Sequence, residues 1–184
     1  MAAIAISTLA LPDYHDDDEG AYNIRASGED PTNLILMDKE TIYYGGGRSQ
    51  IEFCDLYTRD RRLVHVKRYG GSSVFSHLFA QGVVSAELLL RSVEFRKKLN
   101  EKLPTSHQLA NPDERPVSHD FEVVYAIATR STNNRPSLPL FSRITLRNAY
   151  ERLSALDIPV SLAFIKVTSG QTTDGVIDDQ EAEA

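Results

Sequence analysis

Three polar residues near the middle of the chain have the types and spacing of a metal-dependent phosphodiesterase site. Asp55 ends one apolar run, and His65 and Lys67 lie two positions apart in the next. Because side chains alternate across a strand, His65 and Lys67 share one face. A carboxylate, a second ligand and a lysine on neighbouring strands suit a divalent metal and a phosphate, with the lysine orienting the attacking water. The alternative is a cross-strand ion pair on an exposed hairpin.

Further polar residues extend this prediction. The candidate catalytic residues are Asp55, His65, Lys67 and Gln81. The candidate ligands of a divalent metal, Mg²⁺ or Mn²⁺, are Asp55, His65, Glu19 and Glu52. The candidate phosphate or nucleic-acid contacts are Lys67, Arg68, Ser72, Ser73 and His77. Each has a structural alternative, such as a helix cap, a solvated polar face or a buried histidine with a protein partner.

The elements that would position these residues follow from hydrophobic periodicity. A short helix is predicted over 19–27, and three consecutive antiparallel strands over 34–69. A helix is predicted over 73–90, packed across the strands, and a further helix over 85–103. Beyond a proline-containing loop, the pattern predicts a strand at 121–128, a helix at 142–156 and a strand at 160–167. The closing β-α-β unit favours a parallel strand pair.

The predicted fold class is therefore α/β. It has a mixed sheet with an α-β-β-β-α-β core and a C-terminal α-β extension. Residues 1–18 are predicted to be a flexible acidic segment, 19–168 a single domain and 169–184 a disordered acidic tail. The lone cysteine, Cys54, excludes an internal disulfide, is predicted to be buried, and favours a reducing, cytoplasmic compartment. No membrane span is expected, and the oligomeric state is left open.

Charge is distributed unevenly along the chain. Residues 1–19 and 171–184 hold ten acidic residues and no Lys or Arg, so the net charge of −6 for the whole chain corresponds to +4 for residues 20–170. The basic residues of this middle part cluster near 59–68 and 91–98. Such clusters are compatible with a phosphate backbone, although charge runs are also common on solvated faces.

The run from Leu63 to Tyr69, together with Asp55 on the preceding strand, resembles the restriction-endonuclease-like PD-(D/E)xK core, most closely its Mrr-type branch. This resemblance implies that Asp55 binds a metal and that Lys67 acts at the phosphate. His65 departs from the pattern, because most such nucleases have Glu, Asp or Gln there. Imidazole ligates transition metals but is a poor ligand for Mg²⁺, which favours Mn²⁺.

A second resemblance covers about residues 10–168. Ile51–Asp55, His65–Arg68, Ser72–Gly82 and Leu138–Ser142 are similar to a sporadically distributed bacterial family of unknown function. Its members are typically much longer, so the chain resembles their C-terminal part. The patchy distribution implies mobile elements or defence islands. The two resemblances favour a metal-dependent nuclease or a degenerate nuclease-like domain; the alternative is a non-catalytic module that binds nucleic acid or a protein.

Deleting residues 171–184 should leave folding intact and strengthen nucleic-acid binding, because it removes five negative charges from a basic core. Electrophoretic mobility shifts of the full and shortened chains measure the effect. Weaker binding by the shortened chain would contradict the prediction.

Overall fold

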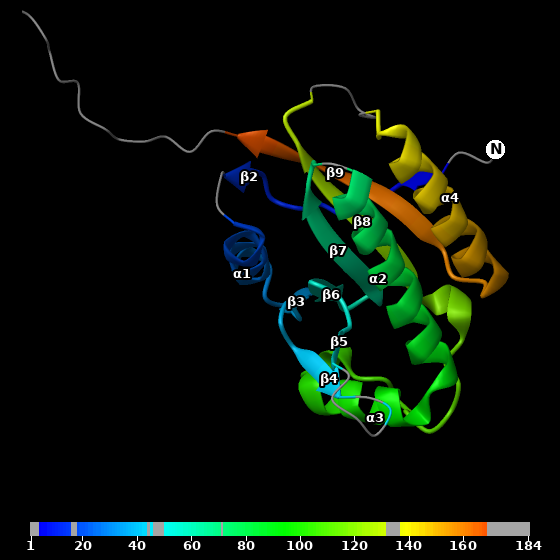
Figure 1. Ribbon diagram of the computed structural model, residues 1–184. Coiled ribbons are helices and arrows are strands. Elements are labelled where there is room, and N and C mark those ends of the chain that lie inside the picture. The colour runs from blue at the N-terminus through cyan, green and yellow to red at the C-terminus, as the bar shows by residue number, and fades with distance from the viewer. Residues whose placement is uncertain are drawn as a thin grey trace, which may run out of the picture.

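A mixed seven-stranded sheet forms the centre of the molecule (Figure 1). The computed structural model describes residues 4–15, 18–43, 45, 50–70, 72–131 and 137–168, without the side chain of Ser72. The sheet order is β1-β9-β8-β7-β6-β3, and β2 also pairs with β9. These strands are β1 (Ala5–Ile6), β2 (Tyr14–His15), β3 (Leu34–Leu36), β6 (Leu56–Thr58), β7 (Arg62–Arg68), β8 (Glu122–Thr129) and β9 (Val160–Thr168). The predicted α/β class with a mixed sheet is confirmed.

The parallel half of the sheet consists of β7, β8 and β9. In this half β8 lies between the other two strands, and residues 123–129 are all buried, as its near-continuous apolar sequence predicts. The helix α4 (Leu140–Ala155) connects β8 to β9, and the predicted parallel pair is confirmed. His65 is in register with Tyr125 and Lys67 with Ile127, so both polar residues lie on the same face of β7.

The antiparallel half differs from the prediction. The segment 34–69 forms five strands instead of three, because β4 (Thr41–Tyr43) and β5 (Gln50–Glu52) make a separate two-stranded sheet. The chain leaves the main sheet after β3, where the N–H groups of Met37 and Asp38 donate to the carbonyl of Asp55. Only β3, β6 and β7 form the antiparallel ladder, and Asp55 lies just before β6.

Two apolar cores lie on opposite faces of the sheet. The larger core packs β7, β8 and β9 against α2 (Ser72–Arg91), α3 (Val93–Lys102) and α4. The helices α2 and α4 lie side by side across this face (Figure 1). The smaller core lies on the opposite face and packs α1 (Glu19–Glu29) through Tyr22 and Ala26 onto Val64 and Val66 of β7. Cys54 is buried in the larger core, as predicted.

Residues 72–102 form two helices whose boundary differs from the prediction. The first helix runs to Arg91, and Ser92 caps the second, its Oγ accepting a hydrogen bond from the N–H of Phe95 at 3.1 Å. By length and composition alone, the segment Ser73–Arg91 is long and apolar enough to cross a membrane. It packs against β7, β8 and α4, and a core helix passes the same test.

The N-terminal segment is also placed differently. Residues 1–18 are predicted to be flexible, but β1 and β2 pair in parallel with β9. Tyr14 is buried and stacks on Tyr22 of α1 with ring centroids 4.9 Å apart. This aromatic contact fastens the segment to the smaller core. The predicted tail at 169–184 lies outside the described residues.

Gly82 allows α2 to lie close to Tyr125 of the sheet. A Cβ there would lie 2.5 Å from the hydroxyl oxygen of buried Tyr125, which donates to the carbonyl of Phe79. We predict that Gly82→Ala lowers the free energy of unfolding by about 1–3 kcal/mol, since a tightly packed core resists added volume. Gly28→Ala is the matched control, because no atom lies within 4 Å of that Cβ. Alanine should raise helix stability there by up to about 1 kcal/mol. Urea unfolding measures both, and equal effects would contradict the packing argument.

Candidate carboxylate–lysine site

The strand β7 extends beyond the end of its neighbour β6, so part of its outer edge has no strand beside it among the described residues. The β6–β7 ladder ends at Leu56 and Val64, and the N–H of Asp55 makes one further bond to the carbonyl of Val64 at 3.0 Å. Beyond that point two carboxylates accept the edge N–H groups of β7. Asp55 Oδ2 accepts from Val66 at 2.6 Å, and Glu19 Oε1 accepts from Arg68 at 3.2 Å. Side chains therefore satisfy backbone groups that a neighbouring strand would otherwise satisfy.

Glu19 also forms an ion pair with Lys67. Glu19 opens α1, whose N-cap is Asp18, and an acid in the first helical turn is favoured by the helix dipole. The two side chains are each about one third exposed. The pair joins residues 48 positions apart, so it couples the start of α1 to the end of β7. Glu19, Asp55 and Lys67, which the sequence analysis singles out, thus lie along one strand edge.

Asp55 has an unusual electrostatic environment. Burial raises the pKa of its carboxyl from 3.8 to about 7, and the nearby charges of Asp38, Glu52 and Glu19 act in the same direction. The hydrogen bond from the N–H of Val66 opposes this rise in pKa. Near neutral pH the group is therefore close to half protonated. A carboxyl held among other acids favours a bound cation, because the cation would relieve their mutual repulsion.

Asp38 and Lys39 belong to the same neighbourhood, and the sequence analysis did not find them. A Cβ on Gly20 would lie 3.1 Å from Lys39 Nζ and 3.3 Å from Asp38 Oδ2. Both residues follow β3 in a tight turn, where Lys39 has a φ of 63°. In sequence they resemble any charged turn. The backbone hydrogen bond from the N–H of Asp38 to the carbonyl of Asp55, at 3.0 Å, brings this turn beside Asp55.

His65 does not join this group of acids through any described contact. Its side chain is 2% exposed, and its ring lies 6.1 Å from that of Tyr125 on the face covered by α2. Burial lowers the pKa of His65 to about 3, so the ring is neutral at physiological pH. Its Nε2 has no hydrogen-bond partner among the described residues. His65 is therefore a buried core histidine, but its Nε2 lacks, among the described residues, the protein partner that the structural alternative predicts.

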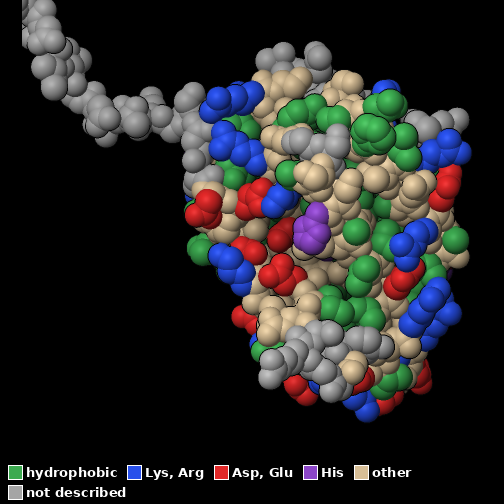
Figure 2. All heavy atoms as spheres, in the orientation of Figure 1, with side chains coloured by type: hydrophobic (Ala, Val, Ile, Leu, Met, Phe, Trp, Pro, Cys, Tyr) green, Lys and Arg blue, Asp and Glu red, His purple; other side chains and the backbone are tan. Residues whose placement is uncertain are grey.

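Glu52, His77 and Gln81 border a cleft between β5 and α2, with a volume of about 380 Å³. Figure 2 shows acidic and basic side chains gathered beside a histidine on this face of the molecule. A regular strand would place Glu52 and Asp55 on opposite faces, because they are three residues apart. Because the chain leaves strand geometry at 53–55, the charge of Glu52 reaches Asp55. The cleft thus adjoins the carboxylate group.

The remaining candidate phosphate contacts are peripheral. Ser73 is exposed in the first turn of α2, and the side chain of Ser72 is not described. Arg68 is exposed at the end of β7, with its guanidinium 5.9 Å from the ring centroid of Tyr14. Of these three residues, only Arg68 has a backbone group bound to Glu19.

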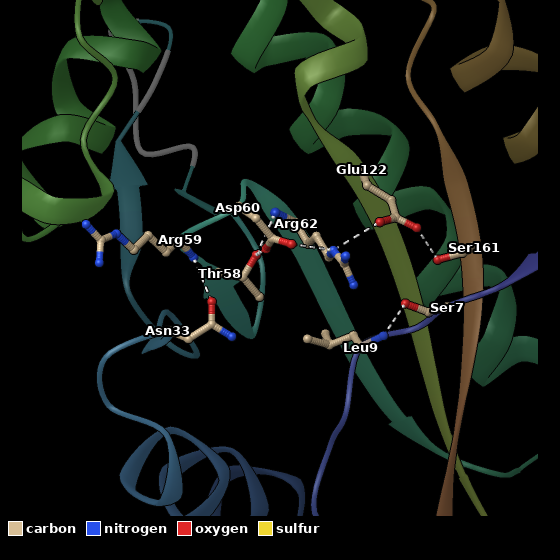
Figure 3. A network of polar contacts seen from close by, with 9 residues as sticks. All are labelled: Ser7, Leu9, Asn33, Thr58, Arg59, Asp60, Arg62, Glu122 and Ser161. Atoms are coloured by element: carbon tan, nitrogen blue, oxygen red, sulfur yellow. Dashed lines mark hydrogen bonds and ion pairs between the residues drawn. The ribbon is translucent and has the colours of Figure 1, made fainter.

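Most described residues of the two basic clusters pair with acids. Arg62 contacts Asp60 at 2.9 Å and Glu122 at 3.2 Å (Figure 3). This network joins the β6–β7 turn to β8, and Glu122 accepts from Ser161 of β9. The other described pairs are Arg61–Asp120, Lys67–Glu19, Lys97–Asp113 and Lys98–Glu94. Arg96 is buried and donates to backbone carbonyls, including that of Leu89. These side chains stabilise loops and helix ends.

Within the described residues, no three His, Cys, Asp or Glu side chains lie close enough together to hold a metal ion. The spacing of the edge contacts explains this for Asp55 and Glu19. They accept N–H groups two residues apart on one strand, a separation of about 7 Å. Direct Mg²⁺–oxygen contacts require about 2.1 Å each. However, Mg²⁺ is commonly held by one or two carboxylates with waters and phosphates completing its shell, and this donor set fits that mode.

The fold and this site define a mixed α/β domain with a group of carboxylates and a lysine at the edge of its sheet. The chain belongs to the family of unknown function DUF6119, whose family model matches residues 1–166. Comparison with curated proteins gives no significant match, and comparison with solved structures gives none.

The raised pKa of Asp55 predicts a pH-dependent effect of Asp55→Asn on stability. Between pH 4 and 7 the folded protein holds a proton that the unfolded chain has released, so this group's contribution to the free energy of unfolding falls as pH rises. Asparagine does not titrate, so the variant does not lose this part of its free energy of unfolding as pH rises. The stability of Asp55→Asn relative to wild type should therefore increase from pH 4.5 to 7.5 by as much as several kcal/mol, since one pKa unit corresponds to about 1.4 kcal/mol.

Urea unfolding of both proteins at the two pH values measures this difference. His65 has the opposite effect, because its lowered pKa makes stability rise with pH between about 3 and 6.5. Its contribution is common to both proteins and cancels in the comparison. A difference that does not change with pH would contradict the raised pKa of Asp55.

Proposed function

We propose that this protein is a metal-dependent phosphodiesterase that acts on nucleic acid, built on a restriction-endonuclease-like core. From α1 to β8, once β4, β5 and α3 are left out, the elements follow in the order α1-β3-β6-β7-α2-β8, which is the α-β-β-β-α-β order expected of that core. An acid at the start of the first helix, an acid before the second core strand and a lysine on the third support the assignment. The observation that carries the proposal is the Asp55 carboxyl, with a pKa of about 7, at the strand edge shared with Glu19 and Lys67.

In this proposal Asp55 would bind Mg²⁺ or Mn²⁺ directly, and Glu19 would hold the ion through a water of its shell, because the two carboxylates lie too far apart to contact one ion together. The bound metal would supply Lewis-acid stabilisation of the phosphate and a more acidic water. Lys67 would leave its ion pair with Glu19 and orient the attacking water or offset the charge of the phosphate. Because Glu19 provides the second carboxylate, the position occupied by His65 needs no ligand. All of the proposed ligand atoms are oxygens, which suits Mg²⁺ as well as Mn²⁺.

A second candidate function is a non-catalytic module that binds nucleic acid or a protein. The observation that favours it is that each proposed group already has a protein partner. Asp55 accepts from Val66, and Glu19 holds Lys67. Under this alternative the two acids only accept hydrogen bonds from the edge of β7. The domain would then descend from a nuclease but no longer catalyse cleavage. Affinity for a divalent cation separates the two candidates.

Lys67→Ala should abolish cleavage and change the free energy of unfolding by less than about 1 kcal/mol, because a partly exposed ion pair contributes little to stability. Asp55→Asn should weaken cation binding by removing a charged ligand. Calorimetric titration with Mn²⁺ and Mg²⁺ measures binding, and plasmid, single-stranded DNA and RNA substrates measure cleavage. Lys102→Ala is the matched control, since Lys102 makes an exposed ion pair with Glu40 at 2.9 Å.

The control variant should retain wild-type cleavage. If the wild type shows neither cation affinity nor cleavage, while Lys67→Ala lowers the melting temperature by several degrees, the site is structural. The binding module then becomes the better assignment.

A further inference from the structure

The cleft between β5 and α2 combines apolar walls with polar side chains that lack partners. Ile51, Ala80 and Val84 contribute apolar surface, and Glu52, His77 and Gln81 contribute polar groups. Its volume of about 380 Å³ lies within the range of about 300–1,000 Å³ typical of small-molecule sites. A flat ring between apolar walls, with its edge toward the polar groups, suits this lining.

The polar groups have unused hydrogen-bonding capacity. His77 and Gln81 lie one turn apart on α2, and neither side chain has a hydrogen-bond partner within the described part of the chain. The carboxylate of Glu52 likewise has no described partner. The strand that carries Glu52 is held to the helix, because Ser85 Oγ donates to the Glu52 carbonyl at 3.4 Å. The three groups therefore sit on two elements joined at the cleft.

The charge of Glu52 determines which part of a nucleotide could occupy the cleft. A carboxylate repels a phosphate, so the phosphate belongs elsewhere. A carboxylate accepts a hydrogen bond from an exocyclic amino group, and the Gln81 amide is able to donate to a neighbouring ring nitrogen. Adenine and cytosine present an amino donor beside a ring-nitrogen acceptor, whereas guanine presents its amino group beside a ring N–H donor, which a donating Gln81 amide would oppose. Thymine and uracil present no amino group.

We propose that the β5–α2 cleft binds an adenine or cytosine base, while the attached phosphate lies toward Asp55 and Lys67. This inference rests on the proposed action on nucleic acid and names the part of the substrate that the cleft recognises. Glu52 connects the two places, because its charge acts on Asp55 while its carboxylate borders the cleft. An unpaired nucleotide fits best, because a base in a duplex has its hydrogen-bonding edge occupied.

The test uses neutral nucleosides, which need neither a metal nor a phosphate site. Saturation-transfer NMR titrations of the full chain with deoxyadenosine, deoxycytidine and thymidine give the three affinities. The two amino-bearing nucleosides should bind about tenfold more tightly than thymidine, the discrimination typical of a well-placed polar pair. Gln81→Leu and Glu52→Gln should each reduce this preference to about threefold or less.

Matched controls alter similar side chains outside the cleft. Asn148→Leu changes an exposed residue of α4, and Glu114→Gln changes an exposed loop residue. Both should keep the wild-type preference. Equal affinity for the three nucleosides, no binding of any of them, or a preference that survives both cleft substitutions would overturn the inference. A nucleoside preference without cation affinity or cleavage would support base binding in the cleft and contradict the proposed phosphodiesterase activity.

Discussion

The unpaired outer edge of β7 is the constraint from which the candidate site follows. Past Val64 this strand has no neighbouring strand on that side among the described residues, yet its N–H groups require acceptors. Asp55 and Glu19 provide them from the loop before β6 and from the first turn of α1. The same two contacts bring both carboxylates to the edge of β7 and fix the start of α1 against the sheet, where Glu19 also forms an ion pair with Lys67.

At Asp55 the fold alone would be served by a neutral hydrogen-bond acceptor, whereas the proposed chemistry needs a carboxyl. Completing the strand edge requires a hydrogen-bonding oxygen, which a neutral side chain could also supply. Holding that oxygen on a carboxyl among Asp38, Glu52 and Glu19 favours a proton or a cation there. A purely structural acceptor gains nothing from such neighbours. The electrostatic cost at this position is therefore the main support for the proposed function.

The charge pattern of the chain has a different meaning in three dimensions. Runs of Arg and Lys at 59–62 and 96–98 suggest a surface for phosphates when read in sequence. In the structure three of these six residues meet acids from distant segments, Arg61 with Asp120, Arg62 with Glu122 and Lys97 with Asp113, while Lys98 pairs with Glu94 in the same helix. Recognition of a nucleic acid would then depend less on broad positive charge and more on the strand edge and the adjoining cleft.

The sequence by itself determined the local elements and the facing of residues within them. Alternation along β7 puts His65 and Lys67 on one face, and the continuous apolar run of β8 predicts burial on both sides, because these features depend on residue spacing alone. The separate β4–β5 sheet, the pairing of β1 and β2 with β9, and the approach of Asp38 to Asp55 depend on contacts between distant segments. Only the tertiary structure decided that His65 is enclosed in the core and that Glu19 reaches Lys67, because burial and long-range pairing are set by how α1 and α2 pack on the sheet.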